Sequence, residues 1–225
     1  MSNSESIEMY LKTIAELGGA GESVSVGKLA ERLGVTAVSA NEMVKRLVRQ
    51  ELVQYQPYKG AILTANGRRL AHNVIRRQRL WECFLVDHLK VDWAIAYDQA
   101  CDLEHATAPE VTESLAAFLN HPATCPHGNP IPDAEGDINP NQGVPLSHWP
   151  VGQTGVITAI LPKTSEVLAY LNDKGIRPSQ TITLTEIAPL DGPFSISING
   201  QTVAIGRQLA ELILISHNDT KTTEP

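Results

Sequence analysis

The spacing of apolar residues changes once along this chain, near residue 150, and that change limits the folds open to it. Up to about residue 135 the apolar side chains recur at helical spacing, with one β-like interruption near residues 52–64. From residue 151 to residue 215 they fall in short β-branched runs cut by turn residues. A stretch rich in Gly, Pro and Asn separates the two patterns. We therefore expect a mostly α protein with a small β domain at its end.

The helical part begins with the pattern of a winged helix-turn-helix. The expected helices cover residues 7–17, 26–33 and 36–50, the hairpin strands cover residues 52–56 and 61–64, and a long helix covers residues 64–88. Gly34 closes the second helix, and Thr36 is a predicted N-cap of the third. A short helix, a turn, a longer helix and a hairpin, in this order, are typical of a fold that places its second helix in the DNA major groove.

The distribution of charge supports a nucleic-acid partner, although the net charge does not. The chain has 18 Lys and Arg against 25 Asp and Glu, a net charge of −7. Residues 41–79 carry nine basic and two acidic side chains, so this window is strongly positive inside an acidic protein. Only the contacting face of a DNA-binding protein has to neutralise phosphates. The alternatives are a solvated helix face, or a helix-turn-helix that serves as a protein-interaction module.

Candidate DNA contacts follow from the groove-facing position of the third helix. Its first residues would reach base edges, and the basic residues after them and in the hairpin turn would lie on phosphates. The candidate base contacts are Thr36, Val38, Ser39 and Glu42, and the candidate phosphate contacts are Lys45, Arg46, Arg49 and Lys59. The same helix is expected to bury Val38, Met43, Val44, Leu47 and Val48.

The β-rich part predicts a small barrel. The expected strands are residues 155–160, 181–185, 194–198 and 202–205. The third strand alternates strictly and runs into Asn199-Gly200, a strong hairpin signal. Several short strands within such a length are typical of a small closed sheet.

A candidate metal site lies on a predicted helix near residue 100. Cys101, Glu104 and His105 stand at positions i, i+3 and i+4, so one helix face would present all three. A thiolate, a carboxylate and an imidazole suit a divalent first-row metal ion. A buried Cys beside a surface Glu–His pair would explain the same spacing.

These segments together resemble the diphtheria toxin repressor family of metal-dependent transcription regulators. The shared segments are Glu8-Met9-Tyr10-Leu11-Lys12-Thr13-Ile14, the winged helix-turn-helix, Gln78-Arg79-Leu80-Trp81-Glu82, Ala100-Cys101-Asp102-Leu103-Glu104-His105 and Gly128-Asn129-Pro130-Ile131-Pro132. The resemblance covers nearly the whole chain. It implies a homodimer that represses transcription by binding a palindromic DNA operator when loaded with Fe²⁺ or Mn²⁺.

The resemblance also implies a domain plan and a regulatory site. The expected parts are a DNA-binding domain over residues 1–70, a helical metal-binding and dimerisation domain over 71–135, a linker over 136–149, an SH3-like, FeoA-like barrel over 150–217 and a disordered tail over 218–225. The regulatory metal ligands fall on Met9, Cys101, Glu104 and His105. A ligand on the first helix would couple metal binding to the spacing of the two DNA-reading domains.

The family's second, ancillary metal site departs from the pattern here. Gln78 and Tyr97 stand where the family uses histidines, and only Glu82 is retained. We therefore expect no ancillary metal and one regulatory metal ion per subunit. Cys125 and His127 form a separate Cys/His pair that is weighed as a weaker metal candidate.

The residue types at the regulatory site bear on metal identity. A thioether and a thiolate disfavour hard Mn²⁺ relative to Fe²⁺, Co²⁺, Ni²⁺ and Zn²⁺, and cellular availability then favours Fe²⁺. A manganese-responsive regulator of the same fold is the alternative. An iron–sulfur or haem sensor using Cys83, Cys101 and Cys125 is less favoured, because no closely spaced cysteine set exists.

Other function classes find little support. No apolar run approaches the ~18 residues of a membrane span, and no secretion signal is apparent. Three cysteines favour a reducing, cytoplasmic setting over a disulfide scaffold. A cysteine- or metal-dependent enzyme is disfavoured, because the chain has no Gly-rich phosphate loop, no His-Glu-x-x-His and no evident base for a nucleophile. No small-molecule substrate and no membrane partner are expected.

Overall fold

The computed structural model describes residues 3–19, 21–161 and 164–217 and divides the chain into two compact units. Unit 1 combines residues 1–78, 103–115 and 131–138, and unit 2 combines residues 79–102, 116–130 and 139–225. The mostly α fold with a small β domain is confirmed. The domain boundaries expected from sequence stay a prediction, and the expected tail, residues 218–225, lies outside the described residues.

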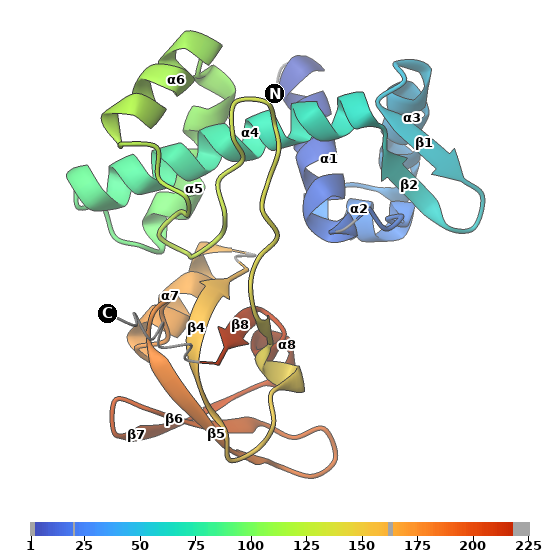
Figure 1. The fold of residues 1–225 in the computed structure, drawn as a ribbon. Coiled ribbons are helices and arrows are strands. Elements are labelled where there is room, and N and C mark those ends of the chain that lie inside the picture. The colour runs from blue at the N-terminus through green and yellow to red at the C-terminus, as the bar shows by residue number, and fades with distance from the viewer. Residues whose placement is uncertain (1–2, 20, 162–163, 218–225) are drawn as a thin grey trace, which may run out of the picture. The chain divides into compact units, whose positions relative to one another are not determined.

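The winged helix-turn-helix belongs to unit 1. Its elements are α1 (Asn3–Gly18), α2 (Val26–Leu33), α3 (Ala37–Arg49), β1 (Val53–Gln56), β2 (Gly60–Leu63) and the start of α4 (Ala65–Cys83). The three helices and the β1–β2 hairpin gather around the first turns of α4 (Figure 1). Buried residues of α1, α2, α3 and the hairpin form one apolar cluster, centred on Leu11, Leu29 and Leu47. This packing holds α3 as a rigid rod beside the wing.

The ends of the reading helix follow the local chemistry that the sequence predicts. The Thr36 side chain accepts a hydrogen bond from the Ser39 backbone N–H at 3.1 Å, so Thr36 is the N-cap, as expected. The expected buried set is partly wrong, however. Val38 is 75% exposed and Val48 is 38% exposed, whereas Ala40, Val44 and Leu47 form the inner stripe. The outer face of α3 is therefore more apolar than its charge pattern suggests.

The middle of the chain is helical. After α4 come a short π-helix, η1 (Phe84–His88), then α5 (Ile95–Ala106) and α6 (Pro109–Phe118). The long helix expected over residues 64–88 is thus present, with its last turn wound as a π-helix.

The C-terminal part of unit 2 is a six-stranded antiparallel sheet. Its strand order is β3-β8-β4-β5-β6-β7. The strands are β3 (Val144–Pro145), β4 (Thr154–Ile160), β5 (Thr181–Ile187), β6 (Phe194–Ile198), β7 (Gln201–Ile205) and β8 (Ile213–Ser216). Three short helices accompany them, η2 (Leu146–His148), α7 (Ser165–Asp173) and α8 (Arg207–Ala210). The four expected strands are all present.

The β6–β7 hairpin turns where the sequence predicts it. Asn199 and Gly200 both have positive φ, 50° and 76°, as a two-residue turn of type I′ requires. Alternate residues of β6, from Phe194 to Ile198, point into the core with Leu168 and Leu171 of α7. None of the helices within the described ranges has the length and apolar character needed to cross a membrane.

Candidate metal centres and DNA-binding face

The first candidate centre is a buried ion pair in unit 1 between α1 and α5. The Lys12 ammonium lies 2.9 Å from both carboxylate oxygens of Glu104. Both side chains are almost completely buried, with 4% and 0% of their surface exposed. Burial raises the pKa of Glu104 to about 7, although the charge of Lys12 opposes the rise. A buried carboxylate of this kind needs a positive partner.

His105 is oriented by a second carboxylate, on α1. Its Nδ1 lies 2.8 Å from Oε2 of Glu8, and the other oxygen of Glu8 accepts a hydrogen bond from Arg77 at 2.9 Å. Arg77 also donates to the backbone carbonyl of Glu104 at 2.7 Å. With Nδ1 donating to Glu8, the lone pair lies on Nε2. This arrangement fixes both the tautomer and the direction of the ring.

The second nitrogen of His105 points at Glu104 without a hydrogen-bond partner. Nε2 of His105 is a buried atom that makes no hydrogen bond, and it lies 3.4 Å from Oε1 of Glu104. A buried lone pair beside a buried carboxylate is costly unless a cation joins them. Imidazole nitrogen and carboxylate oxygen are ligands of divalent first-row metals, so these residues fit such an ion.

The structure brings two of the four predicted metal ligands together, Glu104 and His105. Cys101 lies one turn earlier on α5, half-buried, and packs at the edge of the unit 2 core. Met9 is half-buried on α1, between Glu8 and Tyr10. The four-ligand set with Met9 and Cys101 stays a prediction. Sequence reasoning missed Glu8 and Lys12, which lie 97 and 92 residues from their partners and leave no periodic signal.

The second candidate centre lies in unit 2 and joins Glu82 to Cys125 and His127. One donor atom from each residue lies within 4.8 Å of the others, and all three residues are buried. Nδ1 of His127 lies 3.0 Å from Oε2 of Glu82 and 3.9 Å from the Cys125 sulfur. Its Nε2 donates to the Trp93 carbonyl at 3.2 Å. Thiolate, imidazole and carboxylate are again the donor types of a transition-metal site.

The pKa of Glu82 in this cluster depends on its contact with His127. Burial acts to raise the pKa of Glu82, but the charge and hydrogen bond of His127 outweigh it and leave the pKa lowered. Burial, reinforced by the Glu82 charge, raises the pKa of the Cys125 thiol well above its usual range. A metal ion between these groups would replace the thiol proton of Cys125 and balance the charge of the resulting thiolate.

This cluster contains Glu82, the one residue retained from the ancillary site that is expected to be lost. Gln78 is buried, and Tyr97 stacks edge-on against His127 with centroids 6.1 Å apart, but neither belongs to the donor group. Glu82 is retained, as noted from the sequence, and its partners are Cys125 and His127. The Cys125/His127 pair is visible in the sequence. Because 42 residues lie between Glu82 and Cys125, no local pattern indicates Glu82 as the third donor.

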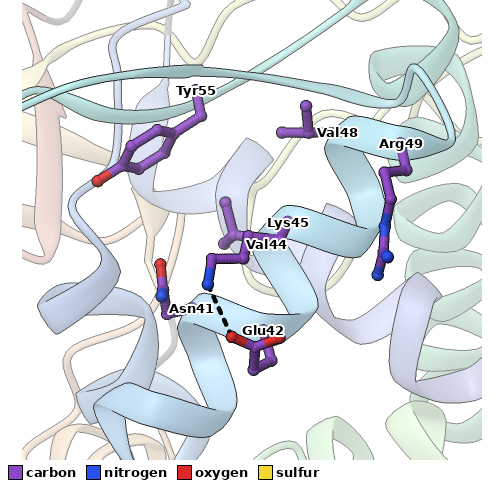
Figure 2. Close-up of a pocket in the computed structure, with 7 residues that line it drawn as sticks. All are labelled: Asn41, Glu42, Val44, Lys45, Val48, Arg49 and Tyr55. Carbon is purple, nitrogen blue, oxygen red and sulfur yellow. Dashed lines mark hydrogen bonds and ion pairs between the residues drawn. The ribbon is translucent and has the colours of Figure 1, made fainter.

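Most of the DNA-binding candidates are exposed. Thr36, Val38, Ser39, Glu42, Lys45, Arg49 and Lys59 are exposed, and Arg46 is half-buried. The Thr36 hydroxyl is engaged with Ser39, at 3.0 Å from its Oγ, so Thr36 acts first as a cap. Lys45 donates to Glu42 at 2.8 Å, and this ion pair lowers the pKa of Glu42. Figure 2 shows the Lys45 side chain directed toward Glu42 on the outer surface of α3.

A hollow of about 410 Å³ separates α3 from the first strand of the wing. Asn41, Lys45 and Val48 line its helix side, and Tyr55 faces them from β1 (Figure 2). The wing tip beyond it exposes Tyr58 completely. The face that carries the candidates is therefore concave, with basic groups around an apolar floor.

The last three arginines of the basic window do not contribute to this face. Arg76 pairs with Glu113 at 2.9 Å, Arg77 pairs with Glu8, and Arg79 bonds to the Pro130 carbonyl. These arginines bind the chain to itself, a role that differs from the solvated helix face weighed from sequence. The charge that remains for a polyanion comes from α3, the wing and the exposed Arg68 and Arg69 at the start of α4.

Comparison with known protein families accounts for nearly the entire chain. Residues 3–61 match the iron-dependent repressor N-terminal DNA-binding domain. Residues 64–133 match the iron-dependent repressor metal-binding and dimerisation domain, and residues 144–217 match the FeoA domain.

Individual proteins show the same similarity. The chain is 32% identical over 221 residues to the diphtheria toxin repressor of Corynebacterium diphtheriae, covering 94% of this chain and 96% of that protein. It is 29% identical over 223 residues to the iron-dependent repressor IdeR of Mycobacterium tuberculosis, with 94% and 96% covered. A solved manganese-dependent transcriptional repressor in complex with manganese superposes with a TM-score of 0.86 at 32% identity, covering 94% of this chain and 99% of that one.

Proposed function

This chain belongs to the iron-dependent, diphtheria toxin repressor family of metal-dependent transcriptional repressors, and on that premise we propose that its effector is Fe²⁺ and its target a palindromic operator bound by a homodimer. The family consists of transcriptional repressors rather than enzymes. The observation that carries the proposal is the buried, unpartnered Nε2 of His105, directed at the buried carboxylate of Glu104.

Glu104 and His105 would hold the regulatory ion, with Cys101 and Met9 completing the set. Glu8 fixes the His105 ring so that Nε2 faces the ion, and Arg77 holds Glu8 in place. A bound divalent cation supplies positive charge that both α1 and α5 can share. Because Glu8 and Met9 lie on α1, the position of the first helix of the DNA-binding domain depends on whether the site is filled.

The choice of Fe²⁺ over Mn²⁺ rests on ligand chemistry and on relatives. A thiolate and a thioether favour Fe²⁺ over the harder Mn²⁺. The relatives named for iron support this choice, whereas the solved structure with manganese keeps Mn²⁺ as the second candidate. Co²⁺, Ni²⁺ and Zn²⁺ are expected to substitute in vitro.

The cluster of Glu82, Cys125 and His127 is proposed as a second metal centre. One donor atom from each residue lies within 4.8 Å of the others, and all three residues are buried. The ligand positions at Gln78 and Tyr97 are not needed for it. If this centre fills, the subunit holds two ions rather than the single ion expected from sequence. Elemental analysis of protein with Cys125→Ser and His127→Ala changes measures this directly, since two ions in the wild type should fall to one.

A dimer is supported by an exposed aromatic face in unit 2. Phe118 is 62% exposed and lies with its ring centroid 5.8 Å from that of Phe84, and Leu89 is 57% exposed. Trp81 stacks edge-on against Phe84 at 5.7 Å. Phe118 is the exposed ring of this cluster, whereas Trp81 and Phe84 are half-buried, and aromatic residues that reach the surface are typical of interface cores. A homodimer would carry two α3 helices, one for each half of a palindromic operator.

Anaerobic operator binding tests the effector. Fluorescence anisotropy with an operator duplex should show tight binding with Fe²⁺ or Co²⁺ and weaker activation by Mn²⁺. Cys101→Ala or His105→Ala should abolish the metal response, while Glu22→Ala, an exposed change on the loop after α1, should leave it intact. Activation by Mn²⁺ in preference to Fe²⁺ would favour the manganese alternative.

A further inference from the structure

Lys12 occupies an unusual place for a lysine. Its side chain is 4% exposed, and its ammonium contacts both oxygens of Glu104 at 2.9 Å. Lysines are almost never fully buried unless they are paired, and burying the pair costs desolvation energy that a surface position would avoid. The pair also lies beside the unpartnered Nε2 of His105, 3.4 Å from Glu104 Oε1. The Lys12 ammonium thus contacts Glu104, a proposed metal ligand.

From this juxtaposition we infer that Lys12 is a built-in competitor of the metal ion, a residue that sets the metal concentration at which the protein responds. The inference rests on the proposed role of Glu104 and His105 as metal ligands. In the metal-free protein Lys12 provides the positive charge that Glu104 needs. The ion must displace that charge before it can bind.

Geometry places the two cations in competition for the Glu104 carboxylate. A first-row metal binds a carboxylate oxygen at about 2.0–2.2 Å. The ammonium already lies against both oxygens at 2.9 Å, so an ion on either oxygen would face a like charge at close range. Inside a buried site, water does not screen this repulsion effectively. A metal ion on Glu104 is therefore expected to weaken or break the contact between Glu104 and Lys12.

The displaced ammonium has a partner on its own helix. Glu16 lies one turn further along α1, at position i+4 from Lys12, and its side chain is 27% exposed. Its present ion pair with Arg32 is loose, at 3.8 Å. A swing of Lys12 from Glu104 toward Glu16 would move its charge from the buried site toward solvent. The exchange takes place on α1, the helix that also carries Glu8 and Met9.

The consequence is a lower metal affinity than the ligand set alone would give. Each ion bound at Glu104 must offset the loss of the Lys12–Glu104 pair. A near-isosteric residue without charge at position 12 removes that competition. It also leaves Glu104 without the Lys12 charge in the metal-free protein, which destabilises that state selectively.

Site-specific metal affinity tests the inference in the full-length protein. Co²⁺ is titrated anaerobically at pH 8, and the concentration that half-protects Cys101 from iodoacetamide is read by peptide mass spectrometry. The melting temperature is measured with and without Co²⁺. The variants are Lys12→Met and Lys12→Gln, the charge-conserving Lys12→Arg, and the matched control Lys28→Met, at an exposed lysine of α2.

Lys12→Met and Lys12→Gln should half-protect Cys101 at a Co²⁺ concentration about tenfold or more below that of the wild type. Their metal-free melting temperatures should fall, and Co²⁺ should raise them by more than it raises the wild type. Lys12→Arg and Lys28→Met should keep the wild-type midpoint. The glutamine variant, whose amide still donates to Glu104, keeps the test open if the methionine variant does not fold.

An unchanged Co²⁺ midpoint in both neutral variants, or a melting temperature lowered equally with and without Co²⁺, would assign Lys12 a structural role and overturn the inference. Failure of the proposed metal site is distinct. In that case Co²⁺ would not protect Cys101 in the wild type, and Glu104→Gln would change nothing.

Discussion

Glu8 is the residue whose role is clearest from contacts and least visible in the sequence. It accepts from Nδ1 of His105 at 2.8 Å and from Arg77 at 2.9 Å, both far away along the chain. Neither composition nor helical spacing indicates such a pairing, because it arises from the packing of α1 against other helices. By contrast, the spacing of Glu104 and His105 on one helix is visible in the sequence, and it makes them candidate ligands.

Removing the Glu8 carboxylate should weaken metal binding without removing a predicted ligand. With Glu8→Ala the His105 ring loses its orientation, and metal affinity should fall by about 10- to 100-fold. Competition of Co²⁺ with a chelating dye measures the change. Glu22→Ala, at an exposed position, is the control, and equal affinities for the two variants would refute the positioning role of Glu8.

The three cysteines should differ sharply in reactivity. Burial, with the charges of Glu82 and Asp87, raises the pKa of Cys83 to about 12, so only about one ten-thousandth of it is thiolate at pH 8. Cys125 is buried with a raised pKa, whereas Cys101 is half-buried. Iodoacetamide at pH 8 should therefore label Cys101 first in the metal-free protein, and mass spectrometry of timed samples checks the order. Faster labelling of Cys83 or Cys125 would contradict the described burial.

At the level of elements, boundaries were predictable where local chemistry sets them. The Thr36 cap, the α2 span and the Asn199-Gly200 turn all follow from a few adjacent residues. The helix α7 and the strand β8 were missed. Each is short, and its place depends on what it packs against, since β8 lies between β3 and β4 and every residue from Ile213 to Ile215 is buried.

Two residues on the exposed face of α3 should affect DNA binding differently, one through base specificity and the other through affinity for DNA of any sequence. A carboxylate accepts from the amino group of cytosine, so Glu42→Gln should change the preferred base at one operator position. Arg49→Ala should weaken binding to all sequences alike and reduce the salt slope by about one. Binding to a set of single-base operator variants at several salt concentrations distinguishes the two effects. A uniform loss with Glu42→Gln would show that this residue does not read a base.

At the scale of the molecule, unit 2 joins helical segments to the six-stranded sheet through a shared apolar core and through the loop that carries His127 and Asn129. The Ile160 backbone N–H donates to the His127 carbonyl at 2.8 Å, and the Asn129 amide donates to the Ile160 carbonyl at 2.8 Å. The composition break at residues 136–149 gives no indication of these bonds. A linker is visible in sequence, but a hydrogen bond that crosses it is not.

Gly128 makes this close approach possible. Its φ is +81°, and a Cβ there would lie 2.1 Å from the Thr158 carbonyl oxygen. Gly128→Ala should lower the free energy of unfolding by roughly 2–4 kcal/mol and loosen the nearby Cys125–His127 pair. Gly27→Ala, in α2 with open space around it, should be neutral or slightly stabilising. Urea unfolding compares the two, and equal stability would mean that the loop does not need this contact.

The most direct measurement is the operator affinity of the intact dimer, first stripped by chelator and then reloaded anaerobically with Fe²⁺. If a metal ion at Glu104 and His105 controls DNA binding, reloading should tighten the dissociation constant by about 100-fold or more. His105→Ala should remain at the stripped value. Equal affinities for the stripped and reloaded protein would contradict the proposal that a metal ion controls DNA binding.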